Sequence, residues 1–105
     1  TLETPRQMKP IEDRVKISID FPDKFYRGAF EGESRYDARA EGDGLVMHFE
    51  RGGDEKRSVS VHLHHNVLAG LLIAWAESLT EASPVDTRHA TDIRSALRAV
   101  EKALG

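Results

Sequence analysis

The chain contains no cysteine among its 105 residues, which excludes disulfide bonds, zinc–thiolate sites and thiol catalysis. A cysteine-free chain fits a reducing compartment, so we expect a cytoplasmic location. Long hydrophobic runs are lacking too. The longest stretch without a polar side chain is 67–76, which is shorter than the roughly 20 residues of a membrane span. We therefore expect no membrane partner.

An excess of positive charge is also missing. Lys and Arg number 15 against 18 Asp and Glu, and the net charge is −3. Domains that bind nucleic acids usually carry a basic face, whereas both signs are mixed along this chain, so we predict no nucleic-acid partner. The sequence also lacks a phosphate-binding loop and the GxGxxG and HExxH motifs, and it predicts no cofactor.

The length of the chain predicts one domain. Residues 1–13 are polar and contain two prolines, which is typical of a flexible N-terminal tail. The remaining residues, 14–105, are then a single α+β domain.

Alternating apolar and polar residues predict a strand at 15–21 and three further strands at 36–40, 45–50 and 58–64. The segment 22–34 is open between a strand that returns as a hairpin and a short helical turn. Turns are expected at Gly42-Asp43, where glycine would supply a positive φ, and around Gly53.

These turns also predict the register of the last three strands. A two-residue turn at 42–43 pairs Ala40 with Leu45, and a turn centred on Gly53 pairs Leu45 with Val61. The inner face of this β-meander is then apolar and its outer face polar. One predicted outer row consists of Asp37, His48 and Ser58.

Two helices are predicted after the strands. The first covers 66–82 with Asn66 as its N-cap, and the second follows Ser83 as cap and Pro84 as first helical residue, and ends near Leu104. His89 lies on the apolar stripe of the second helix. The expected fold class is α+β: an antiparallel β-meander of three to five strands, followed by two antiparallel helices packed on one face of the sheet.

Three histidines lie within four positions, at the end of the last predicted strand. His62 and His64 are two residues apart, so their side chains share the outer face about 7 Å from each other. Glu41 falls in the predicted row of His62 and is a third candidate for a metal site. One hypothesis is therefore a small metal-binding or hydrolytic protein that uses His48, His62 and His64. The alternative is that these are exposed histidines that only form hydrogen bonds.

The first helix gives the stronger signal. Residues 67–76 are apolar on every side, whereas a helix that covers a sheet needs only one apolar stripe. The sheet and the second helix would leave Ala69, Gly70, Ile73 and Ala76 for another subunit. The sequence thus favours a small protein-interaction domain, homodimeric and without catalysis of its own.

A third hypothesis places a ligand between segment 22–34 and the sheet. Four aromatic residues there are candidates for contact with it: Phe25, Tyr26, Phe30 and Tyr36. The alternative is that these side chains belong to the core.

Overall fold

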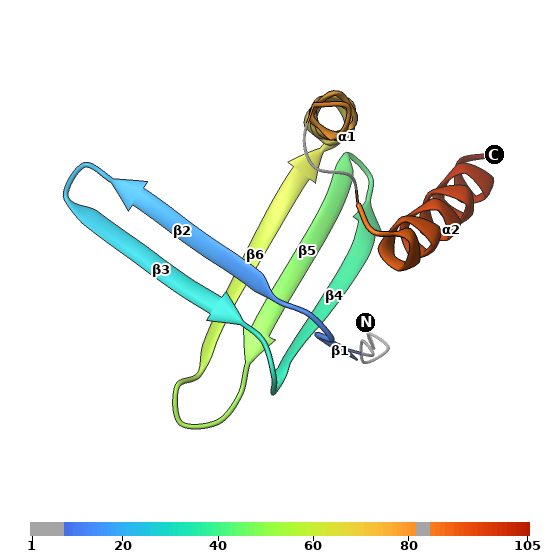
Figure 1. The fold of residues 1–105 in the computed structure, drawn as a ribbon. Coiled ribbons are helices and arrows are strands. Elements are labelled where there is room, and N and C mark those ends of the chain that lie inside the picture. The colour runs from blue at the N-terminus through green and yellow to red at the C-terminus, as the bar shows by residue number, and fades with distance from the viewer. Residues whose placement is uncertain (1–7, 82–84) are drawn as a thin grey trace, which may run out of the picture. The chain divides into compact units, whose positions relative to one another are not determined.

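The computed structural model describes residues 8–81 and 85–105 and shows an α+β chain. Within these residues, six strands precede two helices (Figure 1). The elements are β1 (Lys9–Pro10), β2 (Val15–Phe21), β3 (Lys24–Phe30), β4 (Ser34–Glu41), β5 (Gly44–Arg51), β6 (Arg57–His64), α1 (His65–Leu79) and α2 (Thr87–Leu104).

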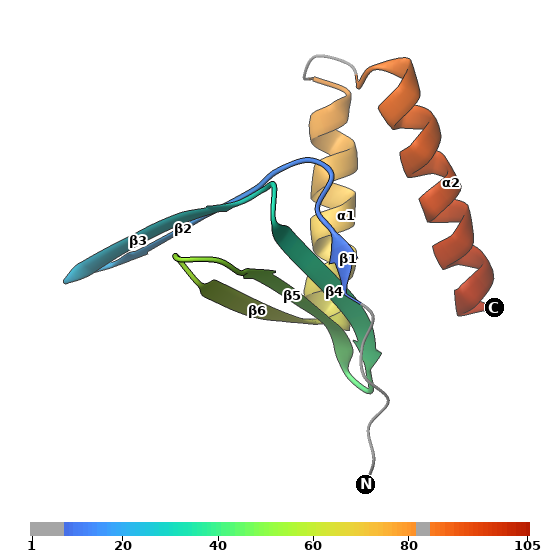
Figure 2. The ribbon, with the colours of Figure 1, turned by 90° about the horizontal axis from the view of Figure 1, so that it is seen from below.

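The strands form two antiparallel sheets. One has the order β1-β4-β5-β6 and contains the predicted meander, and the other is the hairpin β2-β3. The open question about 22–34 is thereby answered, because β3 is a strand that returns along β2 after a two-residue turn at Pro22-Asp23. The hairpin projects away from the four-stranded sheet (Figures 1 and 2).

The predicted tail 1–13 extends too far towards the C-terminus. Lys9 and Pro10 form β1, which pairs with Tyr36 and Arg35 of β4, and Ile11 is buried. The prolines suggested a tail, but proline is tolerated in an edge strand such as β1 because its missing N–H is not needed there. Residues 1–7 lie outside the described part of the chain.

The turn between β4 and β5 lies where it was predicted, with Glu41 opposite Gly44 and Ala40 opposite Leu45. The reason given for Gly42 is wrong, because neither Gly42 nor Asp43 has a positive φ. Instead, glycine is required at Gly44. A Cβ atom there would lie 2.0 Å from the carbonyl oxygen of Leu63 on β6.

The predicted register between β5 and β6 is wrong by two residues. Leu45 lies opposite Leu63 rather than Val61, and the connecting loop is 52–56. An even shift keeps every side chain on its predicted face, so the apolar inner face is preserved. The partners across the outer face do change.

The helices begin later or earlier than the capping residues suggest. α1 starts at His65, directly after β6, so Asn66 is a helical residue rather than the N-cap. α2 starts at Thr87 with Asp86 as its N-cap, and the predicted cap at 83–84 lies outside the described residues. Neither helix is long and apolar enough to cross a membrane.

The contacts within the chain group it into two compact units, Thr1–Leu68 and Ala69–Gly105. The first unit contains a small core in which Phe30 is 3% exposed and stacks at a tilt on Phe49, with 6.1 Å between ring centroids. Neither helix contains a buried residue. The packing of the helices on the sheet stays a prediction.

Candidate functional site

Three side chains converge at the end of the sheet where β6 passes into α1. Nε2 of His62 donates to Oδ1 of Asp43 at 2.9 Å, and Nε2 of His64 lies 3.6 Å from Oδ2 of the same carboxylate. The two imidazole rings are 4.8 Å apart between centroids. One ligand atom from each residue lies within 4.8 Å of the others, and all three residues are exposed.

The local fold explains why these residues meet. His62 and His64 project to the same face because side chains alternate along β6. Asp43 is the second residue of the β4–β5 turn, which lies beside the end of β6, where Gly44 is opposite His64. The backbone N–H of His65 donates to the carbonyl oxygen of Asp43 at 3.0 Å and so ties the turn to the start of α1.

The histidines also change the acidity of the Asp43 carboxyl group. Desolvation alone would raise its pKa, but the hydrogen bond from His62 and the charges of His62 and His64 outweigh it and lower the pKa below its ordinary value. The carboxylate is therefore ionised throughout the neutral range.

Glu41, the third candidate ligand from the sequence, is not part of this cluster. In the observed register it shares a row with Gly44 and His64 rather than with His62, and its carboxylate pairs with Nε of Arg39 at 3.0 Å. Sequence reasoning missed Asp43 because it treated that residue only as part of a turn. The signal was available, since a turn and a strand end that meet at one edge bring their side chains together.

The predicted row of Asp37, His48 and Ser58 is wrong in its last member. The two-residue shift places Ser60 opposite His48, and Nδ1 of His48 accepts from the Ser60 hydroxyl at 2.7 Å. Nε2 of His48 donates to Glu50 at 3.2 Å. His48 is therefore held between two neighbours on the outer face, apart from the cluster of Asp43, His62 and His64.

His89 is exposed rather than part of a covered apolar stripe. Its backbone N–H donates to Oδ2 of Asp86 at 3.2 Å, and its ring Nδ1 donates to Oδ1. Both hydrogen bonds, with the ring contributing most, lower the pKa of Asp86. This pair therefore caps the start of α2.

The helices expose large apolar side chains. Every residue from 69 to 78 is exposed, including the predicted interface residues Ala69, Gly70, Ile73 and Ala76, and Ile73 is 60% exposed. An apolar groove runs between α1 and α2 and is lined by side chains that include Leu72, Trp75, Ile93 and Leu97. Both helices therefore present apolar surface that this chain's second unit does not cover.

The four aromatic candidates for ligand binding do not form one site. Phe30 belongs to the core, whereas Phe25 and Tyr26 are more than half exposed and point to opposite faces of β3. Tyr26 packs edge-on against Phe21, with 6.1 Å between the centroids. Tyr36 lies on β4 at the rim of a hollow that Ile11 and Phe49 also line.

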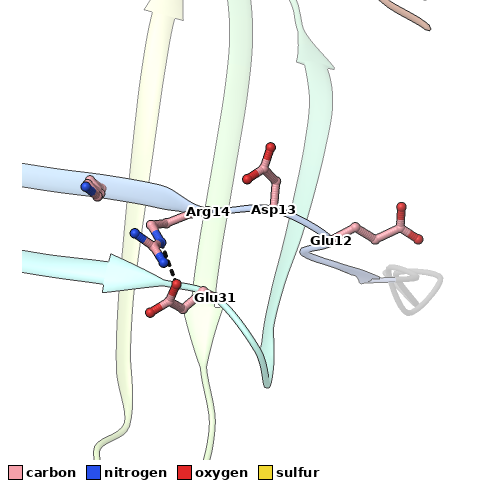
Figure 3. Close-up of a pocket in the computed structure, with 5 residues that line it drawn as sticks. Glu12, Asp13, Arg14 and Glu31 are labelled. Atoms are coloured by element: carbon pink, nitrogen blue, oxygen red, sulfur yellow. Dashed lines mark hydrogen bonds and ion pairs between the residues drawn. The ribbon is translucent and has the colours of Figure 1, made fainter. Parts of the chain in front are cut away.

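A polar hollow beside the start of β2 is lined by Glu12, Asp13, Arg14, Lys16 and Glu31 (Figure 3). Nε of Arg14 donates to Glu31 at 2.5 Å, and the carboxylates of Glu12 and Asp13 point away from this pair. The charges here are satisfied by each other or by solvent, and their arrangement indicates no particular ligand.

Comparison of the chain with protein-family models, with curated proteins and with solved structures found no match.

Proposed function

We propose that this chain is a small protein-interaction domain that works as a homodimer and has no catalysis of its own. One observation carries the proposal: α1 has a single charged side chain, Glu77, and yet every residue from 69 to 78 is exposed. A helix that is apolar all round is normally surrounded by other elements.

The helices expose a large apolar area. Eight large apolar side chains of the helices are 41% to 81% exposed: Val67, Leu71, Leu72, Ile73, Trp75, Leu97, Val100 and Leu104. At roughly 100 Å² each, they present about 800 Å², which the sheet, the other helix and a second copy would cover between them. A second copy of this chain supplies an apolar surface of the same kind.

The proposed arrangement uses three burial partners for α1. The two helices lie antiparallel on the apolar inner face of the sheet, whose side chains Leu45, Met47 and Phe49 are only half-buried. The third side of α1, which contains Gly70 and Ile73, packs on α1 of the second copy about a twofold axis. A side chain at Gly70 would meet nothing within 4 Å, so a second backbone has room to approach there.

Light scattering coupled to gel filtration tests this proposal. We expect a dimer for the wild-type chain and a monomer for Ile73→Glu, because the new carboxylate would be buried without a partner at the interface. Ser95→Glu is the matched control: it adds the same charge to the polar side of α2 and should leave the dimer intact. A wild-type chain that stays monomeric at millimolar concentration would refute the proposal.

The cytoplasmic location belongs to this proposal as well and is supported by the absence of cysteine.

Hydrolysis at Ser60 is the second candidate function. The hydrogen bonds from Ser60 to His48 and from His48 to Glu50 join the three residue types of a hydrolase triad. A fluorophosphonate probe would label Ser60 in the wild-type chain and not in His48→Ala if this candidate is right. Equal lack of labelling in both would exclude it.

A further inference from the structure

We propose that Asp43, His62 and His64 bind one divalent transition-metal ion per chain, with Zn²⁺ as the ion of best fit. The proposal does not rest on self-association, because all three residues belong to the sheet unit and none lies on the exposed surface of α1.

The donor atoms suit zinc in kind and in number. Two imidazole nitrogens and one carboxylate oxygen form a common ligand set for zinc, and three protein ligands leave the remaining coordination to water. The same set also binds Co²⁺, Ni²⁺ and Cu²⁺, whereas Mg²⁺ and Ca²⁺ prefer oxygen ligands alone.

The distances suit a metal as well. Ligand atoms around a tetrahedral zinc are about 3.3 Å apart when the bonds are close to 2.05 Å. The Asp43 oxygens lie 2.9 Å from Nε2 of His62 and 3.6 Å from Nε2 of His64, on either side of that value. Small rotations of the side chains would bring all three atoms onto one ion, and the ring proton of each histidine would then lie on Nδ1.

The backbone holds the three ligands before any ion binds. His62 and His64 are fixed by the pairing of β6 with β5, opposite Val46 and Gly44. Asp43 is held by the N–H of His65 on its carbonyl oxygen.

His48 and His89 provide contrasts within the same chain. Each has one carboxylate beside its ring, Glu50 and Asp86 respectively. Only the cluster at the end of β6 gathers three donors within the described residues. A metal ion would therefore prefer this site because of its third ligand, since histidine–carboxylate pairs also occur elsewhere in the chain.

Titration of the untagged, full chain with Co²⁺ tests the proposal by its visible absorption, which is strong when the ion is four-coordinate. We expect one ion per chain, displacement by Zn²⁺, and at least tenfold weaker binding in each of His62→Ala, His64→Ala and Asp43→Asn. Binding should be unchanged in His48→Ala and His89→Ala. Circular dichroism establishes that each variant is folded before its affinity is compared.

Two outcomes would overturn the site. The first is a wild-type chain that binds neither Co²⁺ nor Zn²⁺ below 1 mM, and the second is equal affinity in the wild type and in the folded His62→Ala/His64→Ala variant. The monomeric variant Ile73→Glu should keep the wild-type affinity, so that failure of the metal site and failure of the proposed dimer are separated.

Discussion

The two helices of this chain differ in what they require from their surroundings. α2 has six charged side chains, a local cap at Asp86 and a basic residue in its last turn, whereas α1 has one charged side chain, no basic residue in its last turn, and a start that continues directly from β6. A capped helix with a polar side can lie at a surface, but α1 needs apolar neighbours on several sides. The difference predicts that stability depends on the side chains of α1 in more directions than on those of α2.

The largest expected effect comes from shortening three apolar side chains that point in different directions around α1. Leu71, Leu72 and Ile73 point about 100° apart around the helix, and if the proposed packing buries all three, each change to alanine lowers the free energy of unfolding by about 2–4 kcal/mol. In α2, Leu97→Ala should have a comparable cost, whereas Ser95→Ala should stay within about 0.5 kcal/mol of wild type. Urea unfolding at a fixed chain concentration measures these values. If Ile73→Ala left the free energy of unfolding unchanged, α1 would need no more apolar neighbours than α2.

A smaller effect is expected where α1 leaves the sheet. Alanine at Gly44 would press its Cβ against the carbonyl oxygen of Leu63 and the Cα of His64, so Gly44→Ala should cost about 1–3 kcal/mol. The matched control is Gly42→Ala, whose Cβ would meet nothing within 4 Å. Thermal unfolding of both variants checks the pair, and similar melting temperatures would show that the strands separate there without cost.

The cap of α2 can be removed on its own. Asp86→Ala leaves the N–H of His89 without its acceptor, so amide hydrogen exchange should accelerate in the first turn of α2 and stay unchanged in α1. The melting temperature should fall by a few degrees. Asp92→Asn, also on α2, serves as the control. Faster exchange in both helices would contradict the idea that only α2 begins at a local cap.

The smallest effect is the dependence of this cap on pH. The pKa of Asp86 is lower in the folded chain, so the unfolded chain takes up the proton first as the pH falls. The cap therefore stabilises α2 fully above the ordinary carboxyl pKa of about 4, and this stabilisation is lost as the pH falls through the folded value. Amide exchange of α2 against pH measures it, and Asp86→Asn should show no such change over that range.

The pattern of side chains predicted which segments form β4, β5 and β6 better than it predicted the register between them. Alternation and the position of the turn sufficed for β4, β5 and β6 and for the pairing of Ala40 with Leu45, because a slip of one residue would have exposed the apolar set. The same reasoning could not detect the two-residue shift of β6, since an even shift exposes nothing. Alternation therefore could not predict which residues of β6 share a row with His48 and with Glu41.

The candidate site was predicted in part for the same reason. His62 and His64 follow from the period of a strand, which is local information. Predicting Asp43 required the position of the β4–β5 turn relative to the end of β6. The two-residue shift had displaced that end. The cap of α2 was missed because Ser83 and Pro84 resemble a helix start as closely as Asp86 does, and only the hydrogen bond from His89 identifies the residue that is used.

β6 passes into α1 without a connecting residue, so the last residue of the strand determines where the first turn of the helix begins. His64 is the last residue of β6 and His65 the first of α1, so no flexible residue separates their geometries. One residue inserted at this point would turn every following side chain of α1 by about 100° and advance it by about 1.5 Å. Seven inserted residues would restore the orientation to within about 20°. The number of residues at this junction therefore sets the rotation of every α1 side chain about the helix axis.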